Sequence, residues 1–407
     1  MTGDLTEILR IEGGQVLATL IRLTRSFDLA EDALQDATVV ALQRWPLDGV
    51  PANPAGWLTT VARNKALDRI RRESVRTSKE SEAMRLLGDP PVADGDDRLR
   101  LLFTCCHPAL SLEARVALAL RTIGGVSTVD IARMFLVAEA TMGQRISRAK
   151  KKIAGAHIPY RIPSEKELPG RLDAVLATIY LIFTAAHHAP SGELDSHLDA
   201  GDEAIRLARL LVALMPDEPE ARGLLALLVT THARRVTRLD SAGDVVLLAD
   251  QDRSMWDRGA IIDASSIVDS VMQRGPVGPY QIQAAIASLH SEAERYDQTN
   301  WLRIAQLYRL LEGIQPGPVV RVNRAVAEAQ VSGPAAGLDL LTDIAGSDGW
   351  YLFWSTKADF LRRLGRWDEA VVTYQRALEC SMNDTDRRFL ESRLAGVTHR
   401  STGTGGR

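Results

Sequence analysis

Apolar residues recur every three to four positions along almost the whole chain, which is the spacing of one face of an α-helix. No run alternates apolar and polar residues as a half-buried strand would. Aromatic residues make up only 5% of the chain, while Ala, Leu and Arg are abundant, and this balance also favours helix over strand. The pattern predicts an all-α fold.

Two stretches interrupt the helical pattern. Residues 74–97 are polar and contain Pro90, Pro91 and an acidic run, and residues 155–170 contain three prolines. The breaks predict a helical domain over 1–73, a flexible linker over 74–97, a second helical domain over 98–155, a helical region over 171–395 and a disordered tail over 396–407.

The long C-terminal region is predicted to consist of helix pairs. Candidate pairs are 202–214 with 219–235, 318–330 with 334–345, and the two halves of 349–379. The last pair is similar to a tetratricopeptide repeat (TPR), in which small residues let two helices approach and aromatic residues fill the gaps. The residues that match this pattern are Ala358, Gly365, Ala370, Tyr374 and Ala377. Stacked helix pairs form an interaction surface rather than a catalytic site.

A helix over 28–45 is predicted, with Asp28 and Glu31 as a capping box at its start. Its inward stripe is Ala30, Ala33, Leu34, Ala37, Ala41 and Trp45. A second stripe consists of Asp32, Gln35, Asp36 and Val39. This second face suits docking on a basic partner helix, and an ordinary solvated face is an equally good interpretation.

A second helix is predicted over 54–73, because Asn53 can cap it and proline follows at the first helical position. Its buried half is Leu58, Val61, Ala62, Ala66 and Ile70. Another face carries Trp57, Thr60, Asn64, Asp68 and Arg71, with Arg63 at its rim. An exposed tryptophan among amide, hydroxyl and arginine groups suits unpaired bases, although a core position for Trp57 is equally possible.

Residues 127–153 are predicted to form a helix-turn-helix that Ser127 caps. The second helix turns Met142, Ile146, Ala149 and Ile153 inward, and its outward groups are Thr141, Gln144, Arg145, Arg148, Lys151 and Lys152. A recognition helix needs this division, because Arg and Gln can read guanine and adenine in the major groove. Gly143 weakens the helix, and we expect close packing or close approach to DNA as the reason.

The formal net charge is −3, so positive charge matters only locally, over 63–72 and 130–153. Cysteine occurs three times, at Cys105, Cys106 and Cys380, which fits a reducing cytoplasm. The N-terminus does not have the pattern of a signal peptide, and the longest uncharged apolar run, 174–186, is too short to span a bilayer. These features predict a soluble cytoplasmic protein without membrane contact.

Neither an enzyme nor a metal or cofactor site is expected. The chain has no glycine-rich phosphate loop and no hydrolase or metalloprotease motif. Cys105, Cys106 and His107 lack a second ligand pair for zinc, and buried thiols are the better interpretation. Two weaker metal candidates are a cluster of His187, His188, Glu193 and His197 and a calcium-like loop at 250–257 without the expected glycine and glutamate.

Three segments together resemble a bacterial extracytoplasmic-function (ECF) sigma factor: AEDALQDATVVALQRW (30–45), GWLTTVARNKALDRIRRE (56–73) and HPALSLEARVALALRTIGGVSTVDIARMFLVAEATMGQRISRAKKKI (107–153). The remainder resembles the subgroup with a TPR-like extension, through GRLDAVLATIYLIF (170–183), DQDRSMWD (250–257), NRAVAEAQVSGPAAGL (323–338) and DGWYLFWSTKADFLRRLGR (348–366). One departure is that Thr184 to His188 stand where the subgroup has a segment of the Asn-Glu-Gly-Tyr type.

The resemblance implies a function in transcription initiation. It also implies a role for each residue of this chain that matches a position in the family's motifs. Asp32, Gln35 and Asp36 would grip the clamp helices of the polymerase beta-prime subunit, and the beta flap would be a further contact with the polymerase. Asn53, Trp57, Thr60, Arg63, Asn64, Asp68 and Arg71 would read the melted minus-ten element, with the loop at 50–53 holding a flipped base. Thr141, Gln144, Arg145, Arg148, Lys151 and Lys152 would read the minus-thirty-five element. The linker would run toward the RNA exit path, and the extension would contact and regulate the sigma domains or support their fold.

Two other functions stay open at this point. A helix-turn-helix regulator could bind duplex DNA without polymerase, although it would need neither the Trp57 face nor the Asp32 face. A repeat scaffold could have an N-terminal half that no longer binds DNA.

Overall fold

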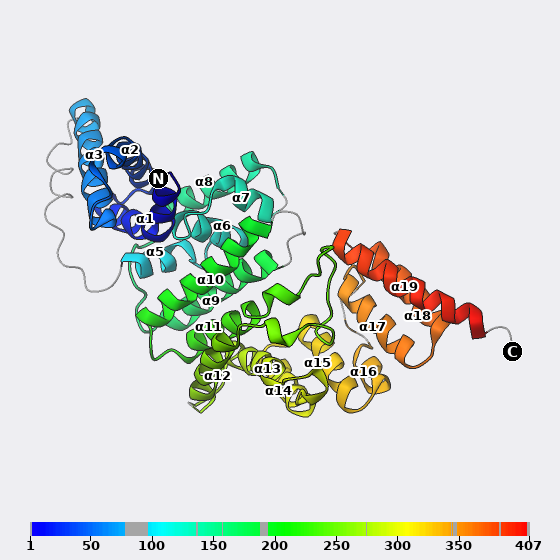
Figure 1. The fold of residues 1–407 in the computed structure, drawn as a ribbon. Coiled ribbons are helices and arrows are strands. Elements are labelled where there is room, and N and C mark those ends of the chain that lie inside the picture. Colours follow the sequence, from blue (N-terminus) through cyan, green and yellow to red (C-terminus); the bar gives the residue numbers. More distant parts are fainter. Residues whose placement is uncertain are drawn as a thin grey trace. The chain divides into compact units, whose positions relative to one another are not determined.

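A computed structural model describes residues 2–77, 97–135, 137–156, 158–187, 194–273, 275–342, 344, 348–381 and 384–404. The predicted all-α fold is confirmed (Figure 1). Within these ranges the only extended pairing is a single β-bridge between Leu239 and Val245. None of the helices in them is both long enough and apolar enough to cross a membrane.

The helices form two compact units. The first consists of 1–188 and 196–214, and the second of 189–195 and 215–407. Helices of the first unit are α1 (Thr2–Thr24), α2 (Phe27–Asp48), α3 (Pro54–Thr77), α5 (Asp97–Cys105), α6 (Leu112–Thr122), α7 (Thr128–Met134), α8 (Glu139–Gly155), α9 (Leu168–His187) and nearly all of α10 (Leu194–Leu214).

Helices of the second unit are α11 (Pro219–His232), α12 (Arg258–Met272), α13 (Pro279–Glu292), α14 (Trp301–Ile314), α15 (Pro318–Val331), α16 (Pro334–Leu340), α17 (Tyr351–Arg363), α18 (Trp367–Glu379) and α19 (Asp384–Thr404). Three short 3-10 helices, η1 (Arg235–Thr237), η2 (Arg253–Met255) and η3 (Tyr296–Gln298), lie between them.

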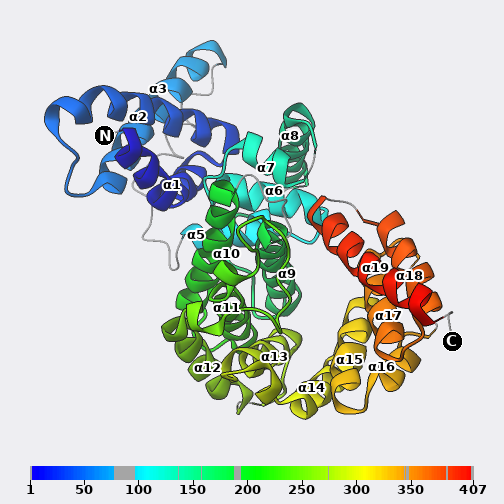
Figure 2. The same ribbon diagram turned by 45° about the vertical axis from the view of Figure 1, so that its right-hand side comes forward.

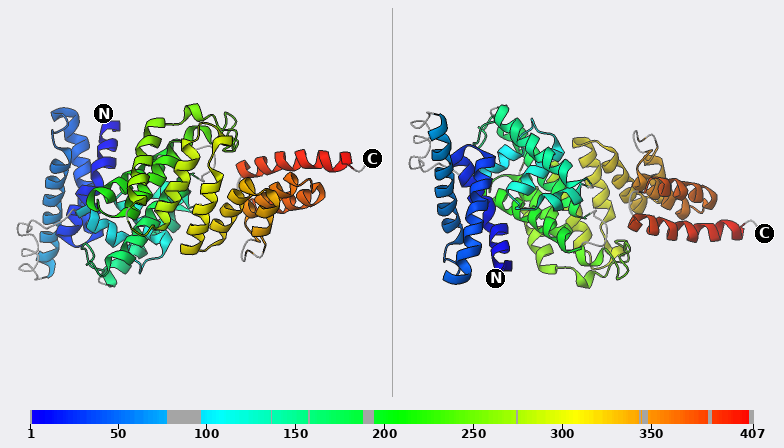
Figure 3. Two further views of the ribbon diagram at one scale, coloured as in Figure 1. Left: turned by 90° about the horizontal axis from the view of Figure 1, so that it is seen from below. Right: turned by 90° about the horizontal axis from the view of Figure 1, so that it is seen from above.

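Helices α1, α2 and α3 lie side by side and form the N-terminal part of the first unit (Figure 3). The predicted alanine stripe of α2 is buried, and Leu34 is half-buried beside it. Small side chains at these positions let the three helix backbones approach closely, and so the longer polar side chains of α2 and α3 are left on the outside.

The predicted capping box at Asp28 is wrong. Helix α2 begins at Phe27, and the Oγ atom of Ser26 accepts the hydrogen bond from the Leu29 N–H at 3.3 Å. Arg25 adopts a left-handed conformation with φ of 53°, which turns the chain into the helix earlier than expected. Helix α2 ends at a glycine, as many helices do. Gly49 has a φ of 82°, which glycine adopts without strain, and its N–H donates to the Trp45 carbonyl.

The helix-turn-helix is formed by α7 and α8, which pack together. The predicted cap is confirmed, because Ser127 Oγ accepts the Asp130 N–H at 3.1 Å. The predicted inward face is confirmed as well, with Met142, Ile146, Ala149 and Ile153 all buried. An apolar face of this kind seats α8 on its neighbours and leaves the opposite face to solvent.

Helix α9 packs against α5 and α6, within the first unit. The Arg171 guanidinium donates a hydrogen bond to the Phe103 carbonyl at the end of α5. From α10, Arg206 donates to the Ile123 carbonyl at 3.0 Å and pairs with the buried Glu203 at 2.6 Å. The first helices of the predicted extension therefore belong to the same compact unit as the helix-turn-helix.

In the second unit, helices that follow one another in sequence also pack together (Figure 2). The expected pairs over 318–345 and 349–379 correspond to α15 with α16 and α17 with α18. The expected pair of 202–214 with 219–235 is divided between the two units, and α11 packs instead against α12 and α13. The small and aromatic residues predicted for the last pair are buried, namely Ala358, Ala370, Tyr374 and Ala377, and Gly365 turns the chain with φ of 74°.

Close packing around Gly337 yields a stability prediction for the second unit. A Cβ atom on Gly337 would lie 2.7 Å from Ala329 Cβ and 2.8 Å from the Ala325 carbonyl oxygen. Gly337→Ala should therefore destabilise this unit by about 1–3 kcal/mol despite its higher helix propensity. Gly313→Ala is the matched control, since no atom lies within 4 Å of its added Cβ. The control should stabilise α14 by up to about 1 kcal/mol. Urea unfolding followed by circular dichroism measures both, and equal midpoints for the two variants would contradict the packing argument.

Candidate nucleic-acid interface

Helix α2 presents acidic and amide groups to solvent on the face opposite its alanine stripe. Asp32 and Gln35 are exposed and Asp36 is half-buried, as the helical spacing predicts. The Asp32 carboxylate forms an ion pair with Arg69 of α3, with the two atoms 2.6 Å apart. Both side chains are more than one third exposed, so a surface pair of this kind is weak and a stronger basic partner can displace it.

Exposed apolar side chains continue this face toward the end of α2. Val39 and Leu42 are each 47% exposed, Leu47 is 85% exposed, and Val50 in the following loop is 50% exposed. Of these, only Val39 was assigned to the outward face from sequence. Leu42 and Leu47 could have been found as well, because neither falls on the alanine stripe that defines the buried side.

Helix α3 begins as predicted, since Asn53 Oδ1 accepts the Gly56 N–H at 2.8 Å. Trp57, one turn later, is half-buried rather than fully exposed. Its ring meets that of Trp45 edge to face, with centroids 5.4 Å apart and an interplanar angle of 61°. The contact holds the Trp57 indole in one orientation while part of its surface stays open to solvent, so the ring has both a core contact and an accessible part.

The remaining residues of the α3 face extend along the helix from Trp57. Thr60, Asn64, Asp68 and Arg71 are exposed, and Arg63 is half-buried. The Thr60 hydroxyl donates to the Gly56 carbonyl at 2.8 Å, which leaves its oxygen able to accept. The structure thus brings the predicted groups onto one side of a single helix.

Helix α8 places five of its six predicted groups in solvent: Thr141, Gln144, Arg148, Lys151 and Lys152. The sixth, Arg145, is half-buried, with its guanidinium 5.6 Å from the centre of the Phe135 ring. This contact limits the rotamers of Arg145 and so favours a fixed direction for its N–H groups. The Lys152 ammonium donates to the Ala109 carbonyl at 2.5 Å, which directs it toward the turn before α6.

Two expectations about α8 need correction. Close packing is not the reason for Gly143, because no atom lies within 4 Å of the position where its Cβ would be. Lys150 lies in the positively charged stretch 130–153 that was expected to face outward, yet its side chain is only 12% exposed. Its Nζ atom lies 2.6 Å from Glu31 Oε2 and 3.6 Å from Asp28 Oδ1, both in α2. Lys150 is therefore engaged within the protein and its charge is compensated there.

The cysteines next to this region are buried, unpaired thiols. Burial raises the pKa of Cys106 to about 12, and it raises the pKa of Cys105 further, so both stay protonated at neutral pH. No group of three potential metal ligands occurs among the residues that the structure describes. The side chains of His187, His188, Glu193 and His197, and with them most of the departure at 184–188, lie outside the described part of the chain. The predicted linker also lies outside it, except for residues 74–77 and Asp97.

The chain matches three protein families in succession. Residues 9–76 match Sigma-70 region 2, residues 100–153 match Sigma-70 region 4, and residues 171–272 match a family of unknown function, DUF6596. The first two matches coincide with the helices that carry the α2, α3 and α8 faces.

Similar proteins match either most of this chain or a part of it. An uncharacterized protein of Rhizobium meliloti (strain 1021) is 43% identical over 393 residues, which covers 93% of this chain and 92% of that protein. The ECF RNA polymerase sigma factor SigM of Mycobacterium tuberculosis is 33% identical over 141 residues, 34% of this chain and 69% of SigM. SigJ, another ECF RNA polymerase sigma factor of that species, is 30% identical over 179 residues, 40% of this chain and 55% of SigJ. No solved structure matches the chain significantly.

Proposed function

The chain belongs to the family of ECF RNA polymerase sigma factors. From this premise we propose which of its surfaces contacts core polymerase and which contact promoter DNA. As a sigma factor it binds core RNA polymerase and promoter DNA and is not an enzyme. Family membership argues against the two other functions. These were a helix-turn-helix regulator that binds duplex DNA without polymerase and a repeat scaffold whose N-terminal half no longer binds DNA. Sigma factors act where the polymerase is, so we place the protein in the cytoplasm.

The α2 face is assigned to core polymerase, on the clamp helices of the beta-prime subunit. Its support is an exposed surface that combines Asp32, Gln35 and Asp36 with the apolar side chains of Val39 and Leu42. Carboxylates steer a basic partner into place, and exposed apolar groups add burial once it has docked. The weak surface pair between Asp32 and Arg69 leaves the Asp32 carboxylate available to a partner that replaces Arg69.

The α3 face is assigned to the melted minus-ten element. A tryptophan that is braced on one edge by Trp45 offers a fixed platform on which an unpaired base can stack. Exposed Thr60 and Asn64 follow on the same side of the helix and can reach base edges, while Arg63 and Arg71 suit phosphates. Asn53 Oδ1 accepts the capping hydrogen bond from Gly56, so we assign the proposed contact with a flipped base to the amide nitrogen of Asn53.

The α8 face is assigned to the minus-thirty-five element in the major groove. The support is the separation of the buried face, with Met142 and Ile146, from the exposed face, with Gln144 and Arg148. Open space around Gly143 is compatible with close approach of a DNA backbone. Region 4 would at the same time contact the beta flap of the polymerase.

The first helices of the extension are proposed to support region 4. This rests on the packing of α9 against α5 and α6 and on the hydrogen bonds from Arg171 and Arg206 to carbonyls of that region. Residues 215–407 are a separate compact unit, and for them we propose the regulatory part of the extension, built from TPR-like helix pairs. The two roles can be separated by the place at which the chain is cut.

The polymerase assignment predicts the effect of a charge reversal on α2. Asp32→Arg should abolish co-purification with core polymerase and promoter-specific transcription in vitro, because it places a cation against a basic partner. Asp48→Arg is the matched control, since Asp48 is exposed near the end of the same helix but outside the proposed surface, and it should retain both. Unchanged co-purification of Asp32→Arg would refute the assigned surface. Failure of the wild-type chain to direct any specific transcript would refute the function itself.

The minus-thirty-five assignment predicts a sequence-specific loss for Arg145→Ala. One lost bidentate contact to guanine should reduce discrimination at a single position by about 1–3 kcal/mol. Binding of the holoenzyme to promoters with each base at that position measures the effect, and Lys151→Ala should weaken all of them alike as a phosphate contact. A uniform loss for Arg145→Ala would instead mark Arg145 as a phosphate contact.

Support of region 4 by the extension predicts different outcomes for two truncations. A chain of residues 1–214 retains α9 and α10 and should unfold with a midpoint close to that of the first unit in the full chain. A chain of residues 1–170 loses both helices, uncovers apolar surface of α5 and α6, and should be less stable and less active in transcription. Thermal unfolding and in vitro transcription check both, and equal stability and activity of 1–170 and the full chain would refute support as well as regulation.

A further inference from the structure

Three arginines gather around Trp256 in the second unit, where α11 and α13 end and α12 begins. The guanidinium carbons of Arg253, Arg234 and Arg258 lie 4.8, 5.7 and 5.9 Å from the centre of the Trp256 ring. The ring itself is buried, and its N–H donates to the Thr237 hydroxyl at 2.8 Å. Three cations this close to one ring repel one another, so the cluster needs a source of negative charge.

Backbone carbonyls at the end of α13 supply a small part of that charge. Arg253 Nη1 donates to the His290 and Ala293 carbonyls at 2.8 and 2.7 Å. Arg258 Nη1 donates to the Ser291 carbonyl at 3.0 Å. The carboxyl end of a helix carries the equivalent of only about half a negative charge. Capping of α13 therefore explains one nitrogen of each arginine and leaves most of the positive charge without compensation.

No acid of the described chain compensates the rest. Neither these three arginines nor the nearby Arg238 forms an ion pair with a described carboxylate. The half-buried side chains of Arg234 and Arg238 also have no hydrogen bond to any described residue. Arg253 is 6% exposed, and its Nη2 atom is buried without an acceptor among the described groups. A buried donor of this kind costs free energy, and an acceptor from outside would remove that cost.

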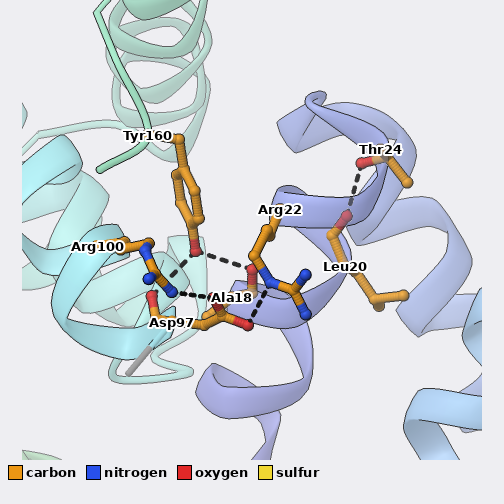
Figure 4. Close-up of polar contacts among 7 residues, drawn as sticks. All are labelled: Ala18, Leu20, Arg22, Thr24, Asp97, Arg100 and Tyr160. Carbon is orange, nitrogen blue, oxygen red and sulfur yellow. Dashed lines mark hydrogen bonds and ion pairs between the residues drawn. The ribbon is translucent and has the colours of Figure 1, made fainter. Parts of the chain in front are cut away.

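Other arginines that are removed from solvent have acidic partners. Arg22 and Arg100 both donate to the Asp97 carboxylate, each at 2.8 Å (Figure 4). Arg206 is paired with the buried Glu203 at 2.6 Å. Each of these guanidinium groups has a carboxylate within hydrogen-bond distance. The arginines around the tryptophan differ from them, since the described part of the chain offers no such carboxylate.

Burial and mutual repulsion lower pKa values in the cluster. Burial, together with the charges of Arg238 and Arg253, lowers the pKa of Arg234 to about 10. Burial, together with the charges of Arg234 and Arg253, lowers the pKa of His290 to about 3. The imidazole is therefore neutral at pH 7, while Arg234 stays charged. A bound anion would relieve the repulsion that both shifts reflect.

We propose that the cluster of Arg234, Arg238, Arg253 and Arg258 binds the phosphoryl group of a small molecule. A phosphate monoester carries a charge of about −1.5 to −2 at pH 7 and three strong acceptor oxygens. A carboxylate carries a single negative charge and two oxygens. Guanidinium groups match a phosphate group through two parallel hydrogen bonds each. Several arginines without an acid therefore suit a phosphate dianion better than a carboxylate.

The depth of the cluster indicates the size of the ligand. Arg234, Arg238 and Arg258 are half-buried and keep part of their surface in solvent, whereas Arg253 and Trp256 are 6% and 3% exposed. Recessed donors favour a small anion over a nucleic-acid backbone, which would need the donors at the surface. The whole site belongs to the second unit, so this proposal goes beyond the function proposed above and does not rest on it.

Calorimetric titration of the full chain with inorganic phosphate and with pyrophosphate tests the site, against sodium chloride of equal ionic strength. The wild type should bind at least one of the two anions saturably. Arg234→Gln should weaken binding by about tenfold or more, because it removes a charged donor. Arg235→Gln is the matched control and should bind like the wild type, since Arg235 is exposed and donates to the His232 carbonyl.

Three results of the titration would overturn the proposal. They are the absence of saturable binding of either anion, equal binding by Arg234→Gln and the wild type, and tighter binding of succinate than of phosphate.

Thermal unfolding separates a ligand site from a purely structural cluster. Without phosphate, Arg234→Gln should melt at the same temperature as the wild type or higher, because it relieves repulsion. Phosphate should raise the melting temperature of the wild type and of Arg235→Gln but not that of Arg234→Gln. A large fall in the melting temperature of Arg234→Gln, with the same effect of phosphate on all three chains, would mark the cluster as structural and overturn the site.

Discussion

The architecture depends on close approach of helix backbones at positions with little or no side chain. Alanines form the buried stripe of α2, and glycines meet a neighbouring backbone or side chain at Gly14, Gly223 and Gly337. Where the inner face is this small, the tight contact excludes longer side chains, and the acidic, aromatic and basic groups must point outward. The proposed face of α2 lies opposite such a narrow apolar face, and the proposed face of α3 lies opposite Leu58, Ala62 and Ala66, whereas α8 buries the larger side chains of Met142, Ile146 and Ile153.

Faces and caps that depend on neighbours in sequence were predictable from the chain alone. The buried set of α8 and the caps of α3 and α7 were found, because spacing and local hydrogen bonds decide them. The start of α2 was placed wrongly, because the left-handed conformation of Arg25 has no signal in the pattern. The partner of Lys150 could not be predicted either, since Glu31 lies 119 residues away along the chain and only the tertiary fold brings the two together.

The same residues that compensate charge in the free protein stand next to those that would bind its partners. Glu31 is adjacent to Asp32, and Lys150 is adjacent to Lys151, so each member of the ion pair between Glu31 and Lys150 borders a proposed binding face. A basic polymerase surface that docks on the proposed α2 face therefore meets carboxylates that are already paired within the chain, Asp32 with Arg69 and Glu31 with Lys150. Loss of these pairs on docking offsets part of the electrostatic attraction between the two surfaces.

A footprint on promoter DNA tests this account most directly. With core polymerase present, the account predicts protection of both the minus-ten and the minus-thirty-five elements. Binding to core polymerase without protection of either element would contradict the central claim that the α3 and α8 faces contact the promoter.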